Sequence, residues 1–152
     1  MRTLARPRDR AEILRRLKQL RPDSVGRWGR MSAHQMVCHL NDSCGMATGE
    51  RPVSRAGRFH ERTILKWLAL YVPVRWPPGF PTVPEIDQHA GGTRPREFAA
   101  DVSRQEMLLT LIATRPETVD RHAHPLFGRL SHAAWLRWAY LHTDHHLRQF
   151  GV

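Results

Sequence analysis

The sequence predicts an all-α protein built as a single domain over residues 1–152. Apolar residues recur at helical spacing in five segments, and three serines stand where a helix N-cap is expected. No segment alternates apolar and polar residues with the β-branched enrichment that is typical of a strand. Apolar residues make up 41% of the chain and charged residues 25%, with five tryptophans, and this composition favours a packed globule over disorder.

The first helix is expected over residues 8–20, within a basic N-terminal segment formed by residues 1–27. Its apolar positions follow helical spacing and are Ile13, Leu14, Leu17 and Leu20. Pro22 prevents the helix from continuing further, because proline lacks the backbone N–H that a helix interior needs. The many arginines of this segment are interpreted first as a solvated helix face and second as a phosphate-binding one.

A second helix is expected over residues 33–48, where the local sequence carries both a start and a stop signal. Ser32 and Gln35 form the capping-box pattern, in which each side chain bonds the backbone N–H of the other residue. Gly49 follows the last helical position, where glycine commonly ends a helix in the left-handed conformation.

Two later helices are also placed by a serine. Ser103 and Glu106 repeat the capping-box pattern and predict a helix over residues 104–114. Ser131 predicts the start of a last helix over residues 132–150, although the box is incomplete there.

The remaining helix is expected over residues 58–71, followed by a connection rich in proline and glycine over residues 72–96. So many prolines forbid regular structure, and a connection of this length is more often a packed functional loop or lid than a tether. Trp76, Phe80 and Ile86 are the side chains expected to anchor it. Five helices with one long crossing connection favour a bundle with non-trivial connectivity.

The formal net charge is +10, with nearly all of the cations arginine, and it favours an anionic partner without choosing among nucleic acid, a membrane surface and an acidic small molecule. Cys38 and Cys44 lie on one predicted helix and point in different directions, so they are expected to be reduced, buried and in a cytoplasmic setting. The longest apolar stretch, residues 64–74, is too short for a membrane span, and no apolar leader is apparent. Neither export nor membrane insertion is expected.

Three histidines, His142, His145 and His146, stand close together in the last predicted helix. Residues four apart differ by about 40° around a helix, so His142 and His146 project side by side, as in H-x-x-x-H metal motifs. His145 offers an alternative pair with His142 at a spacing of three. The apolar stripe through Trp135 and Trp138 continues into His142 and His146 and leaves His145 at its edge, which favours the first pair.

A third ligand is needed, because zinc and related ions usually take three protein ligands and leave a fourth position for water or substrate. His39 lies on the inward stripe of the helix over 33–48, whereas His34 lies about 140° away near its exposed first turn. His39 is therefore the predicted third ligand. The alternative for each of these histidines is a hydrogen-bonded core residue. The other histidines are interpreted as surface, loop or capping residues: His60, His89, His122, His124 and His132.

Two segments and the Pro-rich crossing between them resemble the DinB/YfiT-like superfamily, in particular its branch of uncharacterised function. The segments are MSAHQMVCHLNDS and HPLFGRLSHAAWLRWAYLHTDHHLRQFG, and the resemblance covers the chain from about Trp28 onward. It implies a four-helix bundle in up-down-down-up order, to which the basic N-terminal helix is an addition. It also implies a divalent metal ion held by His39, His142 and His146, the same three residues that helical spacing selects.

The resemblance further implies a metal-dependent enzyme, either a transferase that uses an anionic low-molecular-weight thiol or a hydrolase. A homodimer is also expected, because bundles of this type often pair. Zinc or nickel is the expected cofactor, with iron as an alternative. Asp42, one turn from His39, is a candidate to orient its imidazole, and Arg148 is a candidate to bind an anionic substrate. The alternative function is a non-catalytic basic protein that binds nucleic acid or another anion, with a structural or vestigial metal site.

Overall fold

The computed structural model describes residues 1–56, 59–80 and 82–152 and shows a mostly helical protein, as predicted. Arg58, where the third helix was expected to begin, lies outside the described residues. Within these ranges the elements are α1 Pro7–Leu17, α2 Ala33–Thr48, α3 Phe59–Tyr71, the short 3₁₀ helix η1 Pro84–Ile86, α4 Phe98–Thr114, a second 3₁₀ helix η2 Pro116–Thr118, β1 Ala123–His124, β2 Gly128–Arg129 and α5 His132–Gln149. No helix of the described chain is both long and apolar enough to cross a bilayer.

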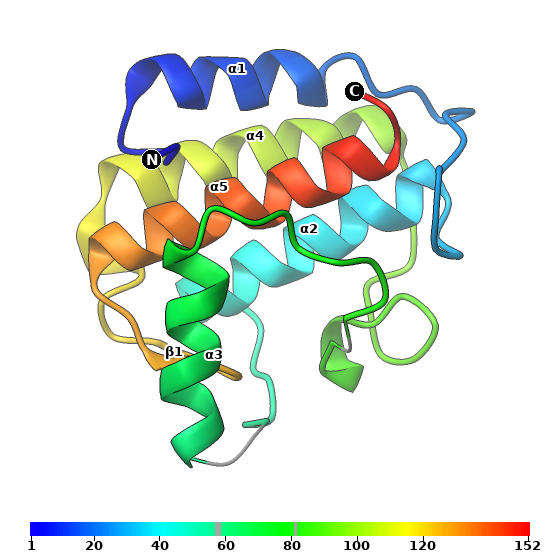
Figure 1. Ribbon diagram of the computed structural model, residues 1–152. Helices are drawn as coiled ribbons and strands as arrows, with labels where there is room; N and C mark the ends of the chain where they lie inside the picture. The colour runs from blue at the N-terminus through cyan, green and yellow to red at the C-terminus, as the bar shows by residue number, and fades with distance from the viewer. Residues whose placement is uncertain (57–58, 81) are drawn as a thin grey trace.

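Four helices, α1, α2, α4 and α5, lie side by side with their axes roughly aligned (Figure 1). α1 and α5 run in the same direction, because Leu4 just before α1 bonds the carbonyl of Leu136 while Arg16 near the end of α1 pairs with Asp144 near the end of α5. The colours of Figure 1 show α2 and α4 running the opposite way. The large apolar side chains between these helices form one core.

α3 lies crosswise to this group and packs mainly on α5 (Figure 1). Its Leu70 is fully buried, whereas Ile64 and Trp67 are more than half exposed. The expectation that the N-terminal helix is an addition to a four-helix unit is therefore wrong. Ile13 and Leu17 of α1 are completely buried against the core, so α1 is one of the four aligned helices and α3 is the peripheral one.

Two of the three predicted serine caps are confirmed. Ser32 forms the full capping box at the start of α2, and the Ser131 hydroxyl accepts the Ala134 N–H at the start of α5. The cap at Ser103 is wrong, because α4 already begins at Phe98. The carboxylate of Glu97 accepts backbone N–H groups of the first turn of α4, so Ser103 lies within the helix.

A short antiparallel hairpin joins α4 to α5, although the sequence indicated no strand. Its turn is organised by His124, whose Nδ1 accepts the backbone N–H groups of Leu126 and Phe127. His124 was expected at the surface or in a loop, but it is buried at 5% exposure because its ring closes this turn against the core. Gly128 takes a left-handed φ of 67°, which favours glycine.

The Pro-rich connection crosses one face of the molecule and contains the short helix η1 despite its prolines. Trp76 and Ile86 anchor it as predicted. The indole N–H of Trp76 donates to the carbonyl of Ala69 at 2.8 Å, and Ile86 is 5% exposed. Phe80 was expected to be a third anchor, but it is 54% exposed.

Candidate metal centre

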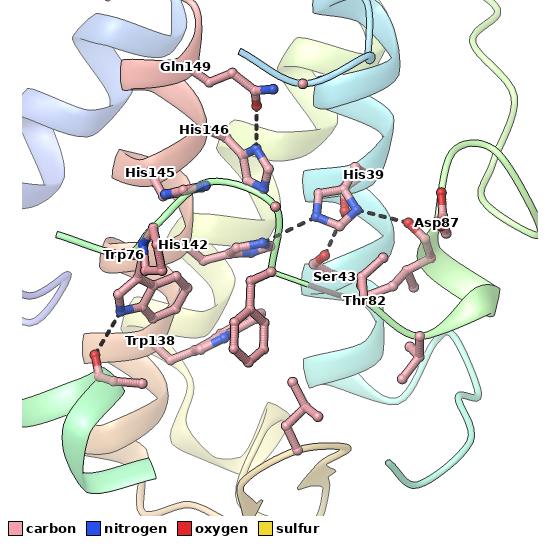
Figure 2. Close-up of a pocket in the computed structure, with 18 of the residues that line it drawn as sticks. His39, Ser43, Trp76, Thr82, Asp87, Trp138, His142, His145, His146 and Gln149 are labelled. Atoms are coloured by element: carbon pink, nitrogen blue, oxygen red, sulfur yellow. Dashed lines mark hydrogen bonds between the residues drawn. The ribbon is translucent and has the colours of Figure 1, made fainter. Parts of the chain in front are cut away.

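Three histidines from two helices converge on one point, as Figure 2 shows: His39 of α2 and His142 and His146 of α5. One ring nitrogen of each lies within 4.8 Å of the corresponding nitrogens of the other two. Nε2 of His39 lies 3.2 Å from Nε2 of His142. The structure thus brings together the three residues that helical spacing selects from sequence.

His39 is oriented by a backbone carbonyl from the Pro-rich connection. Its Nδ1 lies 2.8 Å from the carbonyl oxygen of Ile86. A carbonyl oxygen can only accept a hydrogen bond, so Nδ1 carries the hydrogen and donates it. The neutral imidazole then has its lone pair on Nε2, which faces the other two histidines.

His146 is oriented in the same way by Gln149, which the sequence analysis missed. Nδ1 of His146 lies 2.8 Å from Oε1 of Gln149, and Nε2 of Gln149 donates to the carbonyl of Trp28 at 2.7 Å. The second bond fixes the amide with its oxygen toward the imidazole, so Nδ1 of His146 is the donor. A glutamine three residues after a histidine on one helix was the available sequence signal.

His142 is held by aromatic packing. Its ring stacks on Trp138 with centroids 5.1 Å apart and an interplanar angle of 23°, and Trp76 lies against it at 6.1 Å. Unlike His39 and His146, which are 5% and 8% exposed, His142 is only half-buried. Its ring therefore borders the adjoining cavity.

Burial keeps all three imidazoles neutral. Removal from water lowers the pKa of His39, and it lowers the pKa values of His142 and His146 well below the ordinary value of 6.5. The neighbouring imidazoles lower the pKa values of His142 and His146 further. Neutral imidazole is the form that binds a metal ion, so protons do not compete with a metal ion for these nitrogens near pH 7.

The geometry of this donor set fits a metal ion. Two imidazole nitrogens bound at 2.0–2.1 Å to a tetrahedral ion are about 3.3 Å apart. Nε2 of His39 and Nε2 of His142 are separated by 3.2 Å. Two of the three ligands donate their outer N–H to fixed acceptors, which is the arrangement typical of metal-binding histidines. Three protein ligands leave a fourth position for an exogenous ligand.

The open side of the triad faces a cavity of about 590 Å³. The cavity lies between α2, α5 and α3 and is bounded by the Pro-rich connection and the hairpin; among its lining residues are Trp28, Met46, Leu65, Trp76, Phe127 and Trp138. This volume lies in the range of small-molecule sites, which are typically apolar with a few placed polar groups. The Pro-rich connection, expected to be a packed functional loop or lid, forms one wall of this cavity.

Asp42 does not orient His39 directly, so that prediction was wrong. Its carboxylate accepts the backbone N–H of Thr93 at 2.7 Å and the Thr93 hydroxyl at 2.6 Å, and it pairs with Arg51 at 3.2 Å. Arg51 in turn donates to the carbonyls of Glu85 and Gly91. Asp42 and Arg51 therefore hold the loop that carries the Ile86 carbonyl.

Arg148 and His145 also lie outside the triad. Arg148 pairs with Asp144 at 2.9 Å, so its role as an anion-binding residue is not supported. The ring of His145 packs near Trp28 and Trp76, at 5.8 and 6.3 Å between centroids, and borders the same cavity.

His34, the rejected ligand, belongs to a separate polar group between α2 and α4. Its Nε2 lies 2.7 Å from the Asp101 carboxylate, and Cys38 lies 3.5 Å from the same oxygen. Cys38 and Cys44 are both buried and free, as predicted. Burial raises the pKa of each thiol to about 12, and the charge of Asp101 adds to the effect at Cys38.

Comparison with known proteins identifies a family. No curated protein and no solved structure matches the chain. A family model described as "Protein of unknown function (DUF1569)" matches residues 5–151, which include every helix and all three histidines of the triad. The chain therefore belongs to the DUF1569 family.

Proposed function

We propose that the protein is a divalent-metal-dependent enzyme acting on a small molecule, either a thiol-dependent S-transferase or a hydrolase. The observation that carries the proposal is the convergence of His39, His142 and His146 beside a cavity of small-molecule size. A structural metal site is normally saturated by four protein ligands, whereas three ligands and an adjoining cavity are typical of a catalytic site.

The order of the helices supports a relationship with the DinB/YfiT-like superfamily. α1 and α5 run one way and α2 and α4 the other, which is the up-down-down-up order that the resemblance implies (Figure 1). The ligands also occupy the positions that the superfamily motif implies, one histidine on an early helix and an H-x-x-x-H on the last. We propose that α1, α2, α4 and α5 form the four-helix bundle of this superfamily.

The proposed cofactor is zinc or nickel, with iron as the next candidate, because imidazole ligands suit all three ions. When bound, such an ion acts as a Lewis acid toward a substrate oxygen or stabilises a thiolate. The residues of the chain fix the ligand nitrogens through Ile86 and Gln149 and pack Trp138 and Trp76 against the ring of His142. The low-dielectric surroundings of the buried imidazoles strengthen the electrostatic effect of the ion.

The internal use of arginines weighs against the alternative of a nucleic-acid-binding protein. Arg16, Arg51, Arg137 and Arg148 each bond carboxylates or carbonyl oxygens within the chain. Their charges are therefore committed to the fold. These four guanidinium groups are thus not available to phosphates.

The test is elemental analysis of the purified protein beside two variants. We expect about one divalent ion per chain in the wild type and in His89→Ala, an exposed histidine outside the triad, and a large loss in His142→Ala. Thiol-transfer and ester-hydrolysis assays with the loaded protein then separate the two reaction classes. Equal metal content in wild type and His142→Ala would overturn the site, and salt-dependent DNA binding by the wild type without turnover would favour the alternative.

A further inference from the structure

The walls of the cavity beside the triad are unusually aromatic. Trp28, Trp76, Phe127 and Trp138 all line it, and they come from four separate parts of the chain: the loop before α2, the Pro-rich connection, the hairpin and α5. Figure 2 shows Trp76 and Trp138 beside His142. Aromatic faces favour stacked or edge-on contacts with another ring. A planar apolar ligand is therefore better matched to these walls than a flexible polar one.

Much of the polar lining of the cavity is already engaged in hydrogen bonds of the fold. The Ser43 hydroxyl donates to the His39 carbonyl at 2.7 Å, and Gln149 bonds both His146 and Trp28. The Asp87 carboxylate accepts the backbone N–H of His89 at 2.8 Å. A ligand rich in hydroxyl or amide groups would find few unengaged partners here, and burying unpaired polar groups is costly.

The rim of the cavity is apolar as well. Leu68, Val74 and Phe80 line the cavity and yet are 44%, 62% and 54% exposed. Exposed apolar side chains grouped around a cavity commonly border ligand-binding grooves. Their position indicates where an apolar ligand enters.

Two arginines also line the cavity. Arg30 lies in the loop before α2 and Arg75 in the Pro-rich connection, and both line the cavity while being exposed. Among the residues that the structure describes, neither guanidinium has an ion pair or a hydrogen bond to the chain, in contrast to the committed Arg16 and Arg51. An exposed guanidinium with its donors unused suits a carboxylate, sulfonate or phosphate.

We infer that the cavity binds an aromatic ligand that carries one anionic group, with the ring between the tryptophans and the anion held by Arg30 and Arg75 at the mouth. Only one part of this inference rests on the proposed function, namely that the ligand is the substrate of the proposed enzyme. In this arrangement the end of the ligand opposite the anion reaches the His39, His142 and His146 nitrogens. The anion-binding residues therefore differ from Arg148, which the sequence suggested.

The test compares two fluorescent probes with the same aromatic body, 1-anilinonaphthalene-8-sulfonate and its uncharged analogue N-phenyl-1-naphthylamine. We expect the sulfonate to bind at least tenfold more tightly to the wild type. Arg30→Met with Arg75→Met should remove that preference and leave the neutral probe unaffected, whereas Arg8→Met, an exposed arginine of α1, should change neither. Equal affinities for both probes in the wild type would overturn the anionic group.

Two further variants show whether the probe occupies the cavity. Trp76→Ala should weaken both probes about tenfold or more, while Trp67→Ser, on the exposed face of α3 outside the cavity, should leave both unchanged. A loss confined to Trp67→Ser would assign the probes to the surface of α3 and overturn the inference. His142→Ala separates the two proposals, because it should abolish metal binding and still bind the sulfonate probe.

Discussion

Nδ1 of His39 lies 2.8 Å from the carbonyl oxygen of Ile86, a residue 47 positions further along the chain. This bond makes the tautomer of a helix-borne histidine depend on a loop. The loop is held in turn by Arg51, which donates to the Glu85 carbonyl next to Ile86, and by Asp42, which binds Thr93 at the far end of the same loop. The arrangement of the candidate metal centre therefore extends well beyond its three imidazoles.

Replacing Arg51 should weaken metal binding without touching a ligand. Arg51→Met removes the donors to Glu85 and Gly91, so the Ile86 carbonyl loses its fixed position. We expect metal affinity to fall on the order of tenfold, as for other partners of metal ligands, together with faster amide exchange over residues 84–93. Competition with a chelator measures the affinity. The control is Arg104→Met, which breaks an exposed pair with Glu50 and should change neither quantity.

The positions of the triad residues were predictable from sequence, because they depend on helical geometry. His142 and His146 are four residues apart on one helix, and His39 follows the apolar stripe of another. The capping box at Ser32 set the start of that second helix correctly. Periodicity and caps are local properties, so a single sequence contains them.

The groups that orient the triad were not predictable in the same way. The Ile86 partner is a backbone carbonyl that leaves no trace in residue type, and it comes from a loop folded back onto α2. Helical spacing favours Asp42 as the residue that orients His39, because the two are one turn apart. Its carboxylate instead bonds Thr93 and Arg51. Local spacing identifies neighbours on one helix and says nothing about which loop packs against it.

Replacing Gln149 should weaken metal binding, because its side chain orients the imidazole of His146. Gln149→Met keeps the apolar volume but removes both the acceptor for Nδ1 of His146 and the donor to the Trp28 carbonyl. We expect metal affinity to fall about 10–100-fold. Gln105→Met serves as the control, since Gln105 is equally buried between α2 and α4 but lies away from the triad. If both variants lose affinity equally, general destabilisation is the cause.

Arg16 should be the most important arginine of α1 for stability. It is 9% exposed in its side chain, pairs with Asp144 at 2.7 Å and donates to the carbonyl of Val152, which joins the ends of α1 and α5. Arg16→Met removes one of the two arginines that pair with the Asp144 carboxylate and leaves Arg148. We therefore expect a loss of about 3 kcal/mol in the free energy of unfolding. Arg15→Met, on the exposed side of the same helix, should cost less than about 0.5 kcal/mol by urea denaturation.

The cysteines should be inert in the folded protein. Both are buried, and burial raises the pKa of each thiol to about 12, so almost no thiolate exists at pH 8. We expect Ellman's reagent to react slowly with native protein at this pH and to titrate two thiols after denaturation. Rapid reaction of one thiol in the native state would show that the contact between α2 and α4 opens easily at Cys38 or Cys44.

His124 should make the stability depend on pH in acid solution. Burial lowers its pKa from the ordinary 6.5 to about 3, while its Nδ1 accepts two backbone N–H groups of the hairpin turn. Between these two pH values the unfolded chain binds a proton at this residue and the folded chain does not. The contribution of His124 is therefore fully present above pH 6.5 and is lost as the pH falls toward 3, by about 1.4 kcal/mol per pH unit.

The variant His124→Asn isolates this effect from that of the other buried histidines. The asparagine oxygen can still accept the Leu126 and Phe127 N–H groups, as in an Asx-turn, but the side chain does not titrate. Urea denaturation between pH 4 and 7.5 should show that the free energy of unfolding falls less steeply with decreasing pH in the variant than in the wild type. The two slopes should differ by up to about 1.4 kcal/mol per pH unit, which corresponds to one proton. His39, His142 and His146 remain in both proteins, so their titration contributes equally to the two curves. Parallel curves for the two proteins would mean that the His124 ring is protonated, or reaches water, in the folded state.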